Sequence, residues 1–180
     1  MKVIETSLPG VVLIQPEVHG DSRGHFVETF SAERYRAEAG IDAEFVQDNL
    51  SRSRRGVLRG LHAQKAHPQG KLVRVSRGEV FDVAVDIDPG SPTFGQWAGA
   101  LLTDANQHQM WIPAGYAHGY LVVSDVADFE YKCTDYYYPG DEIGVIWNDP
   151  DIGIEWPMDQ PILSEKDRLL PTLADLGRGA

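Results

Sequence analysis

Residues 56–62 (GVLRGLH) place an arginine and a histidine beside glycines in an otherwise apolar run. A guanidinium suits a phosphate or diphosphate, and an imidazole can accept a proton near neutral pH. A regular strand would send Arg59 and His62 to opposite faces, but a bulge at Gly60 can redirect a side chain. Arg23 also precedes a glycine and suits the same kind of ligand. The alternative interpretation is an ordinary strand with a surface arginine and a packed histidine.

Three further polar residues resemble His62 in their surroundings, because each is predicted to lie on a strand face whose other members are apolar. They are Glu28, Lys71 and Tyr131. One such residue is usually a satisfied core group, but four together indicate an enclosed polar cavity. In that cavity His62 would accept a proton, Tyr131 would donate one, and Lys71 would stabilise a developing oxyanion.

Short strands separated by turns dominate the rest of the chain. Period-two alternation predicts two strands in 71–88, joined at 77–79. The one convincing helix spans 31–40, with Ser31 as its N-cap and Gly40 as its stop. The other predicted strands are 11–14, 25–30, 45–49, 56–62, 97–103, 109–112, 120–123, 129–138 and 143–147. This pattern predicts an all-β sandwich or barrel.

The connections between these strands are predicted from composition. Turns are expected at 19–24 and 89–92, and a solvated basic loop at 51–55. The tail from about residue 149 has no regular pattern, apart from a possible helix start at Ser164. We expect a single domain over 1–180.

Composition excludes several functional classes. The formal net charge of the 180 residues is −11, which argues against non-specific binding to nucleic acid or to an anionic membrane. No apolar run suggests a signal peptide or a membrane helix. The single cysteine, Cys133, cannot form an intrachain disulfide, which favours the cytoplasm. Glycine-rich phosphate loops are absent.

Residues 113–119 (PAGYAHG) match the pattern P-x-G-x-x-H, which resembles the second motif of the cupin superfamily. That resemblance implies a double-stranded β-helix of the jelly-roll type. In metal-binding cupins the histidine of this motif is a ligand, and the first motif supplies H-x-H and a glutamate. Here the first motif has His62 followed by Gln64, so the second histidine is missing. We therefore expect no catalytic metal.

Several motifs together resemble the dTDP-4-dehydrorhamnose 3,5-epimerase family, from about residue 3 to about residue 170. The motifs are GVLRGLH at 56–62, QDN at 47–49, QGKLVR at 69–74, GEVFDVAVD at 78–86, WIP at 111–113 and LSEKD at 163–167. The resemblance implies an isomerase of the cupin fold that acts in dTDP-L-rhamnose biosynthesis, and hence in lipopolysaccharide or O-antigen biosynthesis.

The resemblance also implies roles for individual residues. His62 would be the general base, held by Asp167, while Tyr131 would be the general acid and Lys71 would face the C4 oxygen. The implied substrate-binding residues are Arg23, Glu28, Gln47, Asp48, Asn49, Arg59, His118, Tyr137, Glu142 and Lys166. The family implies a homodimer and no cofactor, and the segment 3–14 is a candidate for strand exchange.

The implied reaction is inversion of C3 and C5 in dTDP-4-dehydro-6-deoxy-D-glucose, which gives dTDP-4-dehydro-L-rhamnose. Three alternatives stay open. A mono-epimerase or keto-sugar isomerase would use the same site. A metal-dependent cupin oxygenase would need bound iron or nickel. A non-catalytic sugar-binding cupin would use the same polar residues only as ligand contacts.

Overall fold

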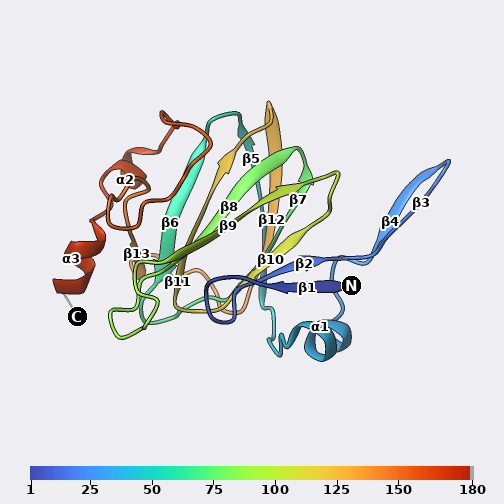
Figure 1. Ribbon diagram of the computed structural model, residues 1–180, viewed down its shortest axis with the longest axis horizontal. Coiled ribbons are helices and arrows are strands. Elements are labelled where there is room, and N and C mark those ends of the chain that lie inside the picture. The colour runs from blue at the N-terminus through green and yellow to red at the C-terminus, as the bar shows by residue number, and fades with distance from the viewer. Residues whose placement is uncertain (179–180) are drawn as a thin grey trace.

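The computed structural model describes residues 1–178, which form two facing antiparallel sheets, a β-hairpin and three short helices (Figure 1). The six-stranded sheet contains, in spatial order, β1 (Lys2–Glu5), β2 (Val12–Gln15), β10 (Gln109–Ile112), β7 (Lys71–Arg77), β12 (Val126–Cys133) and β5 (Gln47–Arg54). The five-stranded sheet contains β13 (Glu142–Gly144), β6 (Leu58–Gln64), β11 (Tyr116–Val122), β8 (Glu79–Asp86) and β9 (Trp97–Thr103). The hairpin is β3 (Val18–Asp21) with β4 (Gly24–Val27), and the helices are α1 (Ala32–Ala39), α2 (Glu165–Arg168) and α3 (Leu173–Arg178). The predicted all-β, jelly-roll class with few short helices is confirmed.

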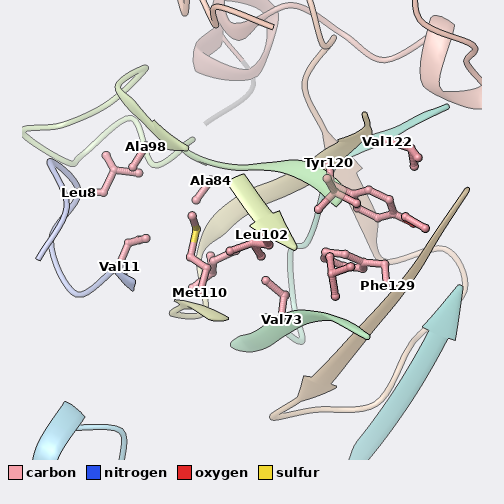
Figure 2. Packing of buried hydrophobic residues seen from close by; sticks show 14 residues of the cluster. Leu8, Val11, Val73, Ala84, Ala98, Leu102, Met110, Tyr120, Val122 and Phe129 are labelled. Atoms are coloured by element: carbon pink, nitrogen blue, oxygen red, sulfur yellow. The ribbon is translucent and has the colours of Figure 1, made fainter. Parts of the chain in front are cut away.

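The main core fills the space between the two sheets (Figure 2). Val73 and Val75 of β7 are fully buried, as alternation along 71–77 predicts. Phe129 of β12 meets Tyr120 of β11 across this space, and their rings stack with centroids 4.0 Å apart. This aromatic pair joins the two sheets. Both rings also line a cavity between the sheets, so the packing of the core fixes that part of the cavity wall.

Helix α1 confirms its predicted caps. The Ser31 hydroxyl accepts a hydrogen bond from the Arg34 N–H, and Gly40 ends the helix in the left-handed conformation with φ of 67°. The predicted helix start at Ser164 is also confirmed, because its hydroxyl caps α2. The strand β1 and the helix α3 were not predicted.

Several predicted elements are wrong in extent, and the strand predicted at 143–147 ends at Gly144. Residues 51–54, predicted as a basic loop, belong to β5, which pairs along its whole length with β12. The strand predicted at 129–138 ends at Cys133, which puts Tyr137 in the following loop. The strand predicted at 120–123 begins at Tyr116, inside the Pro-x-Gly-x-x-His motif.

The hairpin β3–β4 extends away from the two sheets (Figure 1) and replaces the turn predicted at 19–24. The predicted strand 25–30 ends at Val27, so Phe26 and Glu28 do not lie on a core face. Phe26 is 69% exposed, and Glu28 forms a surface ion pair with Arg34 at 3.1 Å. The prediction that Glu28 lies on an apolar strand face is therefore wrong.

None of the helices within the described residues is both long and apolar enough to cross a membrane.

Candidate active site

A cavity with two lobes lies between the facing sheets. One lobe has a volume of about 450 Å³ and the other about 360 Å³. Four side chains line both lobes, namely His62, Lys71, Tyr131 and Glu142. Three of these are residues that the alternation pattern singled out, so the predicted enclosed polar cavity is present.

A bulge in β6 aims His62 into this cavity. The pairing of β6 with β11 shifts register between His118 and Tyr120, opposite Gly60. Gly60 has φ of +117°, and a Cβ atom there would lie 2.7 Å from the Gly119 Cα. Only glycine fits this close approach. The bulge lets Arg59 and His62 line the same cavity, as the sequence predicted.

His62 is held by a carboxylate from the C-terminal segment. Its Nε2 atom lies 2.6 Å from Asp167 Oδ1, and Asp167 is buried at the start of α2. Burial alone would raise the pKa of the Asp167 carboxyl, but hydrogen bonding to His62 and to Ser164 holds this pKa below its usual range. A carboxylate at this distance accepts the Nε2 proton, which leaves Nδ1 as the basic nitrogen of the neutral ring.

A second carboxylate, that of Glu142, lies beside His62 and forms an ion pair with Lys166. Glu142 Oε1 lies 3.6 Å from His62 Nε2 and 2.7 Å from Lys166 Nζ. Glu142 comes from β13, which pairs with β6, and Lys166 comes from α2. The predicted C-terminal helix thus delivers both Asp167 and Lys166 to the cavity.

Tyr131 faces His62 from the other sheet. It shares a face of β12 with Phe129 and Cys133, both buried, as predicted. Burial raises the pKa of Tyr131 to about 12. The phenol therefore keeps its proton at neutral pH and can act as a donor, but not as a base.

Lys71 begins β7 directly opposite Cys133 of β12. Burial lowers the pKa of the Lys71 ammonium, while the carboxylates of Asp82 and Glu142 oppose that change. A desolvated cation in the same cavity as the base and the acid suits an oxygen that gains negative charge.

His118, the histidine of the Pro-x-Gly-x-x-His motif, is held by Asp82. Its Nε2 atom lies 2.8 Å from Asp82 Oδ1, and both side chains are buried. Burial lowers the pKa of His118, although the Asp82 carboxylate opposes this. Within residues 1–178 no group of three His, Cys, Asp or Glu side chains has an arrangement that could hold a metal ion.

A row of small polar side chains lines the cavity from β5. The Arg59 Nε donates to Ser53 Oγ at 3.1 Å, and the Ser51 hydroxyl lies 2.7 Å from that of Tyr120. Further along the same face, Asn49 accepts a hydrogen bond from Gln47 Nε2 through its side-chain oxygen at 3.1 Å. Hydroxyl and amide groups beside one guanidinium suit a ligand with phosphate and hydroxyl groups.

The match to known proteins is specific and covers nearly the whole chain. The family model for dTDP-4-dehydrorhamnose 3,5-epimerase matches residues 5–175. The chain belongs to this family. The epimerase of Pseudomonas aeruginosa is 53% identical over 176 residues, which are 97% of each chain. That of Escherichia coli is 51% identical over 180 residues, covering 99% of this chain and 97% of the relative.

Solved structures agree with the fold. A Legionella pneumophila dTDP-6-deoxy-D-glucose-3,5-epimerase in complex with dTDP-4-keto-L-rhamnose superposes with a TM-score of 0.93 at 52% identity, covering 97% of this chain and 96% of that one. A 3′-monoepimerase from Streptomyces bikiniensis in complex with dTDP-quinovose has a TM-score of 0.90 at 37% identity, covering 96% and 88%.

The cavity contains all but three of the residues that the resemblance to this epimerase family implied. The residues that line it are His62, Lys71, Tyr131, Asp167, Gln47, Asn49, Arg59, His118, Tyr137, Glu142 and Lys166. Asp48 points to the opposite face of β5 and pairs with Lys132 at 3.0 Å. Arg23 lies in the turn of the hairpin, where it pairs with Asp21, and Glu28 pairs with Arg34.

Sequence reasoning missed several residues that line the cavity, among them Ser51, Tyr120 and Ile162 in the larger lobe and Gln64 in the other. A signal for Ser51 was present in the chain. Residues Gln47, Asn49, Ser51 and Ser53 recur at every second position, which is the period of one strand face. The arginines between them made the segment resemble a solvated loop.

Proposed function

We propose that this chain is an isomerase that inverts C3 and C5 of dTDP-4-dehydro-6-deoxy-D-glucose to give dTDP-4-dehydro-L-rhamnose, for dTDP-L-rhamnose synthesis in the cytoplasm. One observation carries the proposal. His62 of β6 and Tyr131 of β12 line one cavity from the two facing sheets, and Lys71 lines it with them. A base and an acid on opposite walls suit inversion of a carbon held between them.

The chemistry uses these groups in order. A ketone at C4 acidifies the C–H bonds at C3 and C5. Nδ1 of His62 takes one of these protons, and the resulting enolate carries its charge on the C4 oxygen, where the Lys71 ammonium stabilises it. Tyr131 then donates a proton to the carbon from the opposite face. Asp167 keeps the His62 ring oriented and stabilises the imidazolium that forms.

Arg59 is the diphosphate-binding residue in this proposal. Replacing Arg59 by alanine should raise the Kd for dTDP by about 10- to 100-fold, because a hydrogen bond to a charged group contributes about 1.5–3 kcal/mol. Titration calorimetry measures the change. Arg36→Ala is the matched control, since Arg36 is an exposed arginine of α1 paired with Asp42. An unchanged Kd in Arg59→Ala would show that Arg59 does not bind the diphosphate.

The configuration of the product tests the proposed function. We expect NMR of the reaction in ordinary water to show inversion at both C3 and C5. Inversion at a single carbon would favour a mono-epimerase, the activity named for the Streptomyces bikiniensis relative. Binding of the dTDP-sugar without any conversion would favour a sugar-binding cupin.

The proposed mechanism needs no metal. Dialysis against EDTA should therefore leave the rate unchanged, because Lys71 supplies the positive charge at the enolate oxygen. The measurement is the initial rate before and after dialysis, with metal content followed in parallel. A loss of rate that added iron or nickel restores would contradict the proposal and favour an oxygenase-type site at His118.

We further propose a homodimer in which the hairpin β3–β4 of one chain reaches the cavity of the other. Arg23 and the exposed Phe26 lie on this hairpin, away from the cavity of their own chain. An arginine and an aromatic side chain suit a nucleoside diphosphate. Sedimentation of the full chain tests the proposal, and a fully active monomer would contradict it.

A further inference from the structure

Gln64, at the end of β6, has a buried side-chain amide and no role in the proposed mechanism. It is 5% exposed, and its side chain makes three hydrogen bonds, all to backbone groups. Its Nε2 donates to the carbonyl of His67 at 2.7 Å and to that of Tyr136 at 3.1 Å. Its Oε1 accepts from the N–H of Tyr138 at 2.8 Å. One side chain thus connects two loops at the edge of the cavity.

The carbonyl of Tyr136 and the N–H of Tyr138, both bound by Gln64, lie on either side of Tyr137 in the chain. The N–H of Tyr137 itself donates to Gln47 Oε1 at 3.0 Å. Three consecutive residues are therefore held by two glutamines, one from each sheet. Tyr137 lines the 360 Å³ lobe of the cavity, and its hydroxyl lies 3.4 Å from Glu142 Oε2.

The other contacts of this loop lie on either side of Tyr137. Gln69 Nε2 donates to the Asp135 carbonyl at 2.8 Å, and the Tyr138 ring stacks on that of His67 with centroids 4.0 Å apart. Tyr137 is 50% exposed and lies outside the ladder of β12, which ends at Cys133. A loop without ladder hydrogen bonds samples several conformations unless side chains hold its backbone groups. A glutamine at position 64 supplies two donors and one acceptor in the directions that these groups require.

We propose that Gln64 is a positioning residue that fixes Tyr137 as one wall of the nucleotide-sugar cavity, and that it thereby sets substrate affinity without taking part in proton transfer. The proposal rests on the proposed function for its kinetic readout. The side-chain hydrogen bonds of Gln64 go neither to the diphosphate-binding Arg59 nor to the base His62. The effect should therefore appear in binding and not in the chemical step.

The first test is the Gln64→Met variant, which keeps the side-chain length and removes the donors and the acceptor. We expect KM and the Kd for dTDP to rise about tenfold while kcat stays within about threefold, because only the binding wall is loosened. Gln107→Met is the matched control. Gln107 is also buried, at 6% exposed, and its Nε2 donates to the Asp104 carbonyl at 2.6 Å, but it does not line the cavity. It should lose stability without a change in KM.

The second test separates an action through Tyr137 from a general structural role. If Gln64 acts through Tyr137, the Gln64→Met change should add little to KM in a Tyr137→Ala background. Additive effects in the double variant would overturn the proposal. So would a fall in kcat with KM unchanged, or a Gln107→Met variant that changes KM as much as Gln64→Met.

A ligand-free readout keeps this inference distinct from the proposed function. In protein labelled with fluorotyrosine, the ¹⁹F signal of Tyr137 is assigned by its loss in Tyr137→Phe. We expect one sharp signal in the wild-type and Gln107→Met proteins, and a shifted or broadened signal in Gln64→Met. An unchanged signal in Gln64→Met would overturn the positioning role. If the signal changes but the wild-type protein does not convert the substrate, only the proposed function fails.

Discussion

Replacing His62 by alanine is expected to lower kcat by about 10²–10⁴-fold, the usual contribution of a positioned general base. Binding of dTDP should be nearly unchanged, because Arg59 and the polar row of β5 remain in place. The reason is geometric. The His62 ring is held by Asp167 at 2.6 Å with its other nitrogen left as the basic site, and alanine removes that nitrogen. Steady-state kinetics and titration calorimetry measure the two quantities.

The control for His62 is His108→Ala, which removes an imidazole outside the cavity and should retain activity. A kcat of His62→Ala within about threefold of the wild-type value would show that His62 is not the general base. Asp167→Asn should give an intermediate loss, since the base remains but its partner no longer stabilises the imidazolium.

Replacing Tyr131 by phenylalanine is expected to separate deprotonation from inversion. The hydroxyl is the only group lost, so the packing against Phe129 should survive. His62 should still form the enolate, and the proton should then return from the His62 side. In deuterated water, NMR should show substrate that takes up deuterium with its original configuration, while formation of the L-configured product falls by about 10²-fold or more.

Two outcomes for Tyr131→Phe would contradict the assignment of His62 as the base and Tyr131 as the acid. Product formed at a near wild-type rate would mean that another group donates the proton. A complete absence of exchange would mean that Tyr131 acts before proton transfer, in binding or in folding. The raised pKa of Tyr131, about 12 because of burial, adds a consistency check. Donation by the phenol should show no loss with rising pH across the neutral range.

Local signals predicted much of the fold because they depend on nearest neighbours. Ser31 and Gly40 mark the ends of α1, since a hydroxyl cap and a left-handed glycine act within one turn. The extent of β5 could not be predicted in this way. Arg52 resembles a loop residue, yet it pairs with Asp128 of β12 at 2.6 Å. That partner is distant in sequence, so no local pattern reveals it.

The same distinction applies to the site. His62, Lys71 and Tyr131 were predicted because a polar residue on an apolar strand face stands out. Glu28 was misplaced because the alternation was extended past the end of β4. Asp48 follows Gln47 directly along a strand, so the period of two places it on the outer face.

In the sequence, Gln64 stood out only as the motif position where a second histidine is missing, and not as a residue that holds a loop. Its partners are backbone groups of two loops, one of them about seventy residues away in the chain. Backbone groups carry no residue identity, so nothing in the sequence points from Gln64 to Tyr137. Only the folded chain brings the amide and these groups together.

Solvent exchange during turnover tests the central claim most directly. The wild-type protein is incubated with dTDP-4-dehydro-6-deoxy-D-glucose in deuterated water, and NMR follows C3 and C5. If His62 and Tyr131 transfer protons on the two sides of the ring, the product should carry deuterium at both carbons. Product without deuterium, or with deuterium at one carbon only, would contradict a double inversion that proceeds through enolates.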